Sequence, residues 1–221
     1  WHEIPDGLLP AMRFCMFSCS KDMSHPVLTC VSVNESGKVE SSDNLRITQV
    51  DAKPSPIGTF LVPATSVKEL VKYEPTHIAS GQGWAHFTTS EGTVFSCRVF
   101  SDNFPKVDQL LQVEGKKIRL PKTANEALDR AAVFSKRDNT LDELVTVKFS
   151  SNKMLIQGQG DVGWFEEELN IRYKEDPVSI SINPSFLQQM IERTDTCILS
   201  QNVMKFEDKD WRHVVCLHVE E

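Results

Sequence analysis

The sequence of 221 residues contains no hydrophobic run approaching the ~20 residues that a helix needs to cross a bilayer. It also shows no signal peptide at its start and no excess of positive charge, since 24 Lys and Arg are outweighed by 31 Asp and Glu, for a net charge of −7. These absences argue against a membrane protein and against a strongly basic nucleic-acid binder. They leave open a protein that is acidic overall and basic on one concave face, because net charge does not describe how charge is distributed.

Motifs for catalysis are missing as well. None of the six histidines lies in a nucleophile motif or in a zinc-protease motif. Residues 81–83 and 158–160 are short Gly-Gln-Gly segments typical of turns, and neither continues into a phosphate-binding loop. The acidic run at residues 166–168 is interpreted as a solvated strand edge rather than a metal site. With no converging set of reactive groups, the sequence predicts a non-catalytic protein that has no cofactor and no metal.

The six cysteines favour a reducing compartment. Cys30, Cys97, Cys197 and Cys216 lie in apolar, strand-like surroundings, which is typical of buried free thiols in a cytoplasmic protein. Cys15 and Cys19 are four residues apart on a predicted helix and could share a metal, but no second pair stands at metal-finger spacing, so a place in the core is favoured for them.

The same pattern of helices and strands occurs twice along the chain, at an offset of roughly 115 to 120 residues. Amphipathic helices are predicted over residues 8–19 and 125–135, because apolar side chains recur there at helical spacing. Each is followed by strand-like segments, a second helix led by proline, and a closing strand of alternating polarity. In the first half these segments are 27–33, 45–48, 66–72 and 92–100, and in the second they are 144–149, 154–156, 185–191 and 211–219.

We therefore predict an α+β protein built from two tandem domains of the same kind, each with two helices packed on an antiparallel sheet. The domains are expected at residues 1–113 and 114–221, joined by a polar linker near residues 112–122 that contains Gly115 and Pro121. Two unrelated α+β domains are the alternative, and the ordered match of the elements favours a duplication.

Four segments in sequence order carry a family resemblance. Residues 42–47 (Ser-Asp-Asn-Leu-Arg-Ile) look like a Thr-Asp-Gly-His-Arg-Leu motif, and residues 104–111 are similar to a Tyr/Phe-Pro-Asp-Tyr segment. Residues 128–135 resemble a helix ending Arg-Ala-Ala-Ile-Leu-Ser, and residues 182–187 look like Phe-Asn-Val-Ser-Tyr-Leu. Together they resemble the second and third DNA-clamp domains of the bacterial-type DNA polymerase III beta sliding clamp, phage versions included. Departures at Asn44-Leu45, for Gly-His, and at residues 214–218, for Val-Val-Met-Pro-Met, concern the details of partner binding.

The resemblance implies a DNA sliding clamp, a processivity factor whose closed ring encircles duplex DNA and tethers the replicative polymerase. Helices line the hole in this family, so a weak, sequence-independent attraction to phosphates is expected from their polar faces. The candidates are lysines and arginines on or after the predicted helices: Arg13, Lys21, Lys68, Lys72, Arg130, Lys136, Arg137 and Arg193. Ordinary solvated helix faces are the alternative for any one of them.

A second implied function is the docking of replicative polymerase and clamp loader, which insert short peptides into an apolar pocket of the family. The matching positions are Leu28, Ser42, Asn44, Leu45, Arg46, Ile47, Pro105, Gln109, Leu110, Asn183, Phe186, Val214, Val215, Cys216 and Leu217. A place in the sheet core is the alternative for Leu28, Ile47, Val214 and Val215. Leu45 and Leu217 are the better tests, because each replaces a different residue type in the family's pocket.

Assembly and location follow from the same resemblance. A homo-oligomer is expected for the full-length protein, in the cytoplasm of a bacterial or phage-infected cell and with no membrane partner. A rival of another class is a non-catalytic clamp-fold adaptor or inhibitor of replication proteins, which would not close a ring. The mass in solution separates the two, because ring closure requires several copies of the domain.

Overall fold

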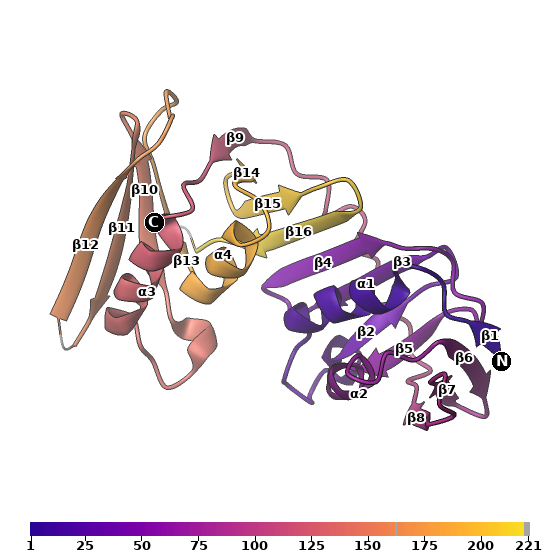
Figure 1. Ribbon diagram of the computed structural model, residues 1–221. Coiled ribbons are helices and arrows are strands. Elements are labelled where there is room, and N and C mark those ends of the chain that lie inside the picture. Colours follow the sequence, from indigo (N-terminus) through magenta and orange to yellow (C-terminus); the bar gives the residue numbers. More distant parts are fainter. Residues whose placement is uncertain (162, 219–221) are drawn as a thin grey trace. The chain divides into compact units, whose positions relative to one another are not determined.

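The computed structural model describes residues 1–161 and 163–218, and the chain divides into two compact units (Figure 1). The first unit contains Trp1–Leu111 together with Lys209–His213, and the second contains Gln112–Asp208 and the residues from Val214 on. Among the described residues, no helix is long and apolar enough to span a membrane.

The first unit combines two helices with antiparallel strands. Its sheets have the strand orders β1-β6-β7-β8 and β5-β2-β3-β4, and the beginning of β16 (Trp211–Cys216) lies beside β4. Short 3-10 helices, η1 (Met16–Ser18) and η2 (Pro26–Thr29), follow the first α-helix. The elements are β1 (His2–Glu3), α1 (Leu8–Cys15), β2 (Cys30–Val33), β3 (Lys38–Ser42), β4 (Arg46–Asp51), β5 (Phe60–Pro63), α2 (Ala64–Leu70), β6 (His77–Gly81), β7 (Trp84–Thr88) and β8 (Val94–Arg98).

The second unit has the same kinds of element. One sheet has the strand order β12-β11-β10-β13, and β9, β14 and β15 form another with the remainder of β16. The elements are β9 (Lys116–Arg119), α3 (Ala124–Phe134), η3 (Thr140–Asp142), β10 (Val145–Ser150), β11 (Lys153–Gly160), β12 (Gly163–Asn170), β13 (Val178–Ile182), α4 (Pro184–Ile191), β14 (Thr196–Leu199) and β15 (Val203–Glu207).

The two units repeat one topology. Strands β4-β3-β2-β5 correspond to β12-β11-β10-β13, and β1-β6-β7-β8 correspond to β9-β14-β15-β16. The helices occupy matching places in the chain, α1 and α3 after the first strand of each unit and α2 and α4 after the fifth. The predicted α+β class and the predicted duplication are both confirmed.

Each helix is held on its sheet by the apolar side chains of one face. In α1 these are Leu8, Ala11, Met12 and Cys15, all buried, and the helix packs against β3 and β4. Their spacing of three and four residues places them in one stripe, while Arg13 remains exposed on the other side. Because the stripe faces the sheet, the polar faces of the helices stay available to solvent.

Four local expectations were wrong. The strand predicted from residue 27 begins at Cys30, because Pro26–Thr29 forms a 3-10 helix in which Thr29 Oγ1 donates to the carbonyl of Pro26 at 2.7 Å. The predicted linker contains β9, which pairs with β14. Residues 158–160 end strand β11 rather than forming a turn. Cys216 is exposed at the end of β16, while the other five cysteines are buried free thiols.

The other predicted segments differ from the observed elements only in where they begin or end. The first predicted helix ends at Cys15 and continues as η1, and the last predicted strand ends at Cys216. Residue 219 of that predicted strand lies outside the described residues. The acidic run is placed as expected, on β12 at the edge of its sheet.

A glycine allows α3 to approach β11 closely. A Cβ at Gly158 would stand 2.2 Å from the carbonyl oxygen of Ala131, which is less than any real contact of this kind. The substitution Gly158→Ala should therefore push the helix from the sheet and destabilise the protein by about 1–3 kcal/mol. Urea unfolding followed by circular dichroism measures this change.

Gly81→Ala is the matched control, because a Cβ there meets nothing within 4 Å. It should leave the free energy of unfolding unchanged to within about 1 kcal/mol. Equal effects of the two substitutions would contradict the close approach of helix and strand at Gly158.

Candidate functional site

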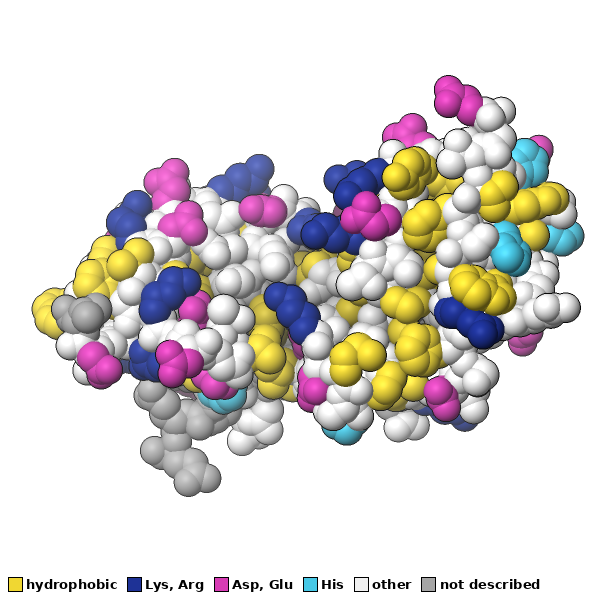
Figure 2. Space-filling model, turned by 90° about the horizontal axis from the view of Figure 1, so that it is seen from below, with side chains coloured by type: hydrophobic (Ala, Val, Ile, Leu, Met, Phe, Trp, Pro, Cys, Tyr) yellow, Lys and Arg dark blue, Asp and Glu magenta, His cyan; other side chains and the backbone are white. Residues whose placement is uncertain are grey.

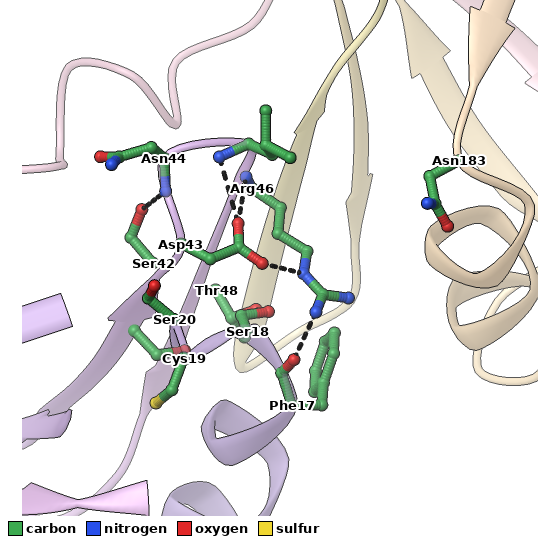
Figure 3. Close-up of polar contacts among 12 residues, drawn as sticks. Phe17, Ser18, Cys19, Ser20, Ser42, Asp43, Asn44, Arg46, Thr48 and Asn183 are labelled. Atoms are coloured by element: carbon green, nitrogen blue, oxygen red, sulfur yellow. Dashed lines mark hydrogen bonds and ion pairs between the residues drawn. The ribbon is translucent and has the colours of Figure 1, made fainter. Parts of the chain in front are cut away.

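The turn between β3 and β4 is fixed by the side chain of Asp43 (Figure 3). Its Oδ1 accepts the backbone N–H of Leu45 at 3.1 Å and that of Arg46 at 3.0 Å. Asn44 takes a left-handed conformation with φ of 71°, which asparagine tolerates better than most residues. Its N–H donates to Ser42 Oγ at 3.2 Å, so the side chains of Ser42 and Asp43 both accept hydrogen bonds from the backbone of the turn.

Arg46 is buried against the same aspartate. Its Nε donates to Asp43 Oδ2 at 2.8 Å, and the two side chains are only 8% and 6% exposed. A second donor, Nη2, reaches the carbonyl oxygen of Phe17 at 2.5 Å, and the guanidinium carbon lies 5.2 Å from the centre of the Phe17 ring. Burial lowers the pKa of Arg46, while the charge of Asp43 opposes that shift. Within the first unit, the ion pair makes this arginine part of the framework of the turn.

The other predicted positions near this turn differ in exposure. Leu28 lies in η2, which packs against β3, and its side chain is buried. Ser42 is buried, Asn44 is exposed, and Leu45 and Ile47 are half-buried. The turn therefore presents Asn44 and part of Leu45 to solvent, on a framework made by Asp43 and Arg46.

The segment after β8 is anchored at the opposite end of the β3–β4 hairpin. Asp108 accepts from the ammonium of Lys38 and from Gln49 Nε2, the latter at 3.1 Å. Lys38 pairs with Asp51, whereas Ser42 beside the turn pairs with Ile47. The exposed predicted residues of this segment, Pro105, Gln109 and Leu110, are thus held near Lys38 rather than beside the turn.

In the second unit most of the predicted docking residues are interior. Asn183 caps α4 by accepting the N–H of Ser185 at 3.0 Å, and its Nδ2 donates to the carbonyl of Thr140 at 2.7 Å. The apolar positions are buried, with exposures of 6% for Phe186, 4% for Val214, 0% for Val215 and 8% for Leu217. Cys216, in contrast, is exposed. Helix capping explains the hydrogen bonds of Asn183, and packing in the core explains why the apolar residues are buried.

The eight basic candidates are all exposed but differ in their partners. Three form ion pairs, Lys72 with Glu69, Arg130 with Glu167 and Lys136 with Glu143. Arg137 donates to the carbonyls of Lys136 and Gln159, and Arg193 to that of Gln189. Within residues 1–161 and 163–218, the structure records no ion pair for Arg13, Lys21 and Lys68.

Charges of both signs are mixed on the surface drawn in Figure 2, where Lys and Arg side chains alternate with Asp and Glu. The part of the chain that the structure describes holds no group of three or more His, Cys, Asp or Glu able to bind a metal ion. Burial raises the pKa of the Cys197 thiol to about 12 and that of Cys97 to about 11, so neither is a reactive thiolate near neutral pH.

Sequence reasoning missed two residues of the turn's framework. Asp43 stands inside the matched motif, and an aspartate three residues before an arginine at a turn is a usable signal for its role. Phe17 offered no comparable signal, because its contact with Arg46 joins residues 29 apart in the sequence. The predicted helix over residues 8–19 gave Phe17 no particular role.

The chain matches no family model. Its fold is similar to solved structures of DNA polymerase sliding clamps. One from Bacillus subtilis has a TM-score of 0.81 at 17% identity, over 100% of this chain and 64% of that one. One from Pseudomonas aeruginosa has a TM-score of 0.79 at 20% identity, over 99% and 66%. The beta subunit from DNA polymerase of Streptococcus pyogenes has a TM-score of 0.80 at 19% identity, over 96% and 63%.

This chain therefore spans slightly less than two thirds of the length of these clamps. At identities of 20% and below, the likeness concerns the fold, and it extends over both units. The protein has the fold of a DNA polymerase sliding clamp.

Proposed function

We propose that this protein is a non-catalytic DNA sliding clamp that surrounds duplex DNA without reading its sequence and tethers a replicative polymerase. The observation that carries the proposal is the repetition of one clamp-like topology in two units, with a fold match to sliding clamps along the whole chain. In this proposal, residues 1–113 and 114–221 are the second and third clamp domains. The protein acts in the cytoplasm.

The DNA-facing surface in this proposal consists of the polar faces of the helices. A sliding protein needs attraction to phosphates that is weak and uniform along the duplex, so a few cations serve better than a strongly basic groove. Arg13 and Lys68 stand on exposed faces of α1 and α2, whose buried faces contact the core. Lys72 and Arg130 are already paired with carboxylates, which supports a modest affinity.

DNA binding should depend on salt through these helix cations. Lys68→Gln should lower the slope of log K against log salt concentration by about 1, because one phosphate contact is lost. Fluorescence anisotropy of a labelled duplex at several salt concentrations measures the slope. Lys153→Gln is the control, since Lys153 lies on β11 and pairs with Glu168. Equal slopes for Lys68→Gln and the unaltered protein would count against the helix faces as the DNA surface.

The docking surface in this proposal includes the β3–β4 turn of the first unit. Short peptides of polymerase and clamp loader bind through a few apolar anchors, and the surrounding rim contributes little. Leu45 is half-buried on a turn that Asp43 fixes, so it offers apolar area without a large cost of ordering. The peptide's anchors would pack against this side chain.

Leu45→Asp should weaken the binding of a polymerase-derived clamp-binding peptide by about tenfold to a hundredfold, because the variant places a charge against an apolar anchor. Titration calorimetry measures the dissociation constant. Leu141→Asp changes a leucine that is 40% exposed in the other unit and should leave the constant unchanged. Unaltered affinity in Leu45→Asp would mean that the peptide docks elsewhere.

Ring closure in this proposal uses the sheet edges that each unit leaves open. Within the described residues β8 ends one sheet and β12 ends another, and each pairs with a neighbour on one side alone. An open edge carries unpaired backbone donors and acceptors that another strand can meet. Val94 on β8 is 55% exposed and Trp164 on β12 is 71% exposed, so both edges also offer apolar side chains. We propose that β12 of one copy pairs with β8 of the next.

Val94→Arg and Trp164→Arg should each shift the protein towards smaller assemblies, because a head-to-tail ring uses both edges at every contact. Sedimentation equilibrium over a range of concentrations measures the mass. Met23→Arg alters a loop residue that is 66% exposed and should keep the mass of the unaltered protein. A chain that is monomeric at all concentrations would favour the adaptor or inhibitor over the ring.

A further inference from the structure

Phe17 lies where the first helix ends, in the short helix η1. Its carbonyl oxygen accepts from Arg46 Nη2 at 2.5 Å, and the guanidinium carbon of Arg46 stands 5.2 Å from the centre of its ring. One residue thus holds Arg46 both through its backbone and through the face of its side chain. A cation over an aromatic ring is attracted more strongly when water is excluded, and the side chain of Arg46 is only 8% exposed.

Two further interactions connect the Phe17–Arg46 contact to the exposed part of the turn. Arg46 Nε binds Asp43, and Asp43 in turn accepts the backbone N–H groups of Leu45 and Arg46. Asp43 can hold both amides only while its carboxylate keeps the orientation that Arg46 gives it. A displaced guanidinium would therefore loosen the backbone at Leu45, although Phe17 itself does not belong to the turn (Figure 3).

Phe17 also touches the beginning of β16. Its ring centre is 5.4 Å from that of His213, which is fully buried and whose Nδ1 lies 2.9 Å from Thr48 Oγ1. The same aromatic ring therefore contacts both Arg46, which anchors the turn, and His213.

We infer that Phe17 is a positioning residue for peptide docking, which acts through Arg46 and Asp43 to hold Leu45 in its binding conformation. The inference rests on the proposed function of the β3–β4 turn as a docking surface. Phe17 need not touch the peptide; its ring and carbonyl decide where Arg46 stands, and Arg46 decides the geometry of the turn.

A role in the core alone predicts a different result from a role in positioning. Phe14 stacks on Phe17 at 5.3 Å and meets Trp211 edge-on at 5.2 Å, so it belongs to the same aromatic cluster. Phe14→Leu therefore removes one ring from the cluster and serves as the control for lost packing. Phe17→Leu removes the ring under Arg46, whereas Phe17→Tyr keeps an aromatic face there.

The test compares these three variants with the unaltered chain in two measurements. Calorimetric titration with a polymerase-derived clamp-binding peptide gives the dissociation constant, and hydrogen exchange followed by NMR gives the protection of the Leu45 and Arg46 amides. Phe17→Leu should weaken peptide binding about tenfold and speed exchange at both amides, because the cation loses its aromatic face. Phe17→Tyr should stay within about twofold of the unaltered affinity, since an aromatic ring still lies under the cation. Phe14→Leu should leave the affinity and both amides unchanged, even where it lowers the melting temperature.

The inference is overturned if Phe17→Leu binds the peptide as the unaltered protein does, or if Phe14→Leu and Phe17→Leu lose affinity equally. Failure of the proposed function looks different, because the unaltered chain would then not bind the peptide at all. In that case the exchange rates still decide whether Phe17 holds the turn: unchanged protection of Leu45 and Arg46 in Phe17→Leu would refute it.

Discussion

Burial of one apolar helix face against an antiparallel sheet is the constraint on which both units depend. A helix this short has little stability in water by itself, so α1, with eight residues, is maintained by Leu8, Met12 and Cys15 packed on β3 and β4. The second unit meets the same need with Ala127, Leu128 and Ala131 of α3, which packs on β11. Because the inner faces are used for packing, polar side chains are left on the outer helix faces.

The turn between β3 and β4 contains a buried ion pair within this packing. Burying Arg46 and Asp43 removes both from water, which is tolerated because their charges neutralise one another and their hydrogen bonds are shared with the backbone. The ion pair adds geometric definition rather than a large net stability. That definition matters for a surface that is proposed to receive a peptide, since a preformed turn has less entropy to lose when it binds. Phe17 connects this ion pair to the aromatic cluster, because its ring contacts both Arg46 and Phe14.

The charge of the chain agrees with the proposed function, in which a clamp holds DNA loosely. With a net charge of −7, general attraction to phosphates is weak, and several exposed cations are engaged by carboxylates. Arg13, Lys21 and Lys68 are exposed on the first unit, and in the proposed clamp a small number of such contacts would attract the duplex without fixing it.

The sequence by itself determined the α+β class, the two-fold repetition and the approximate places of α1 to α4, because periodic apolar residues and proline-led helix starts are local signals. The turn at Asn44 was not predicted as a turn, although asparagine suits the left-handed conformation that the structure shows there. Only the tertiary structure decided that β9 forms inside a polar linker, since β9 pairs with the distant strand β14, as Lys117 does with Ile198, 81 positions further along the chain. It likewise decided that Gly158 permits a close helix approach, that Val214 and Val215 are buried, and that Phe17 supports Arg46. The physical reason is common to these cases: each depends on contacts between distant segments, which local residue preferences do not encode.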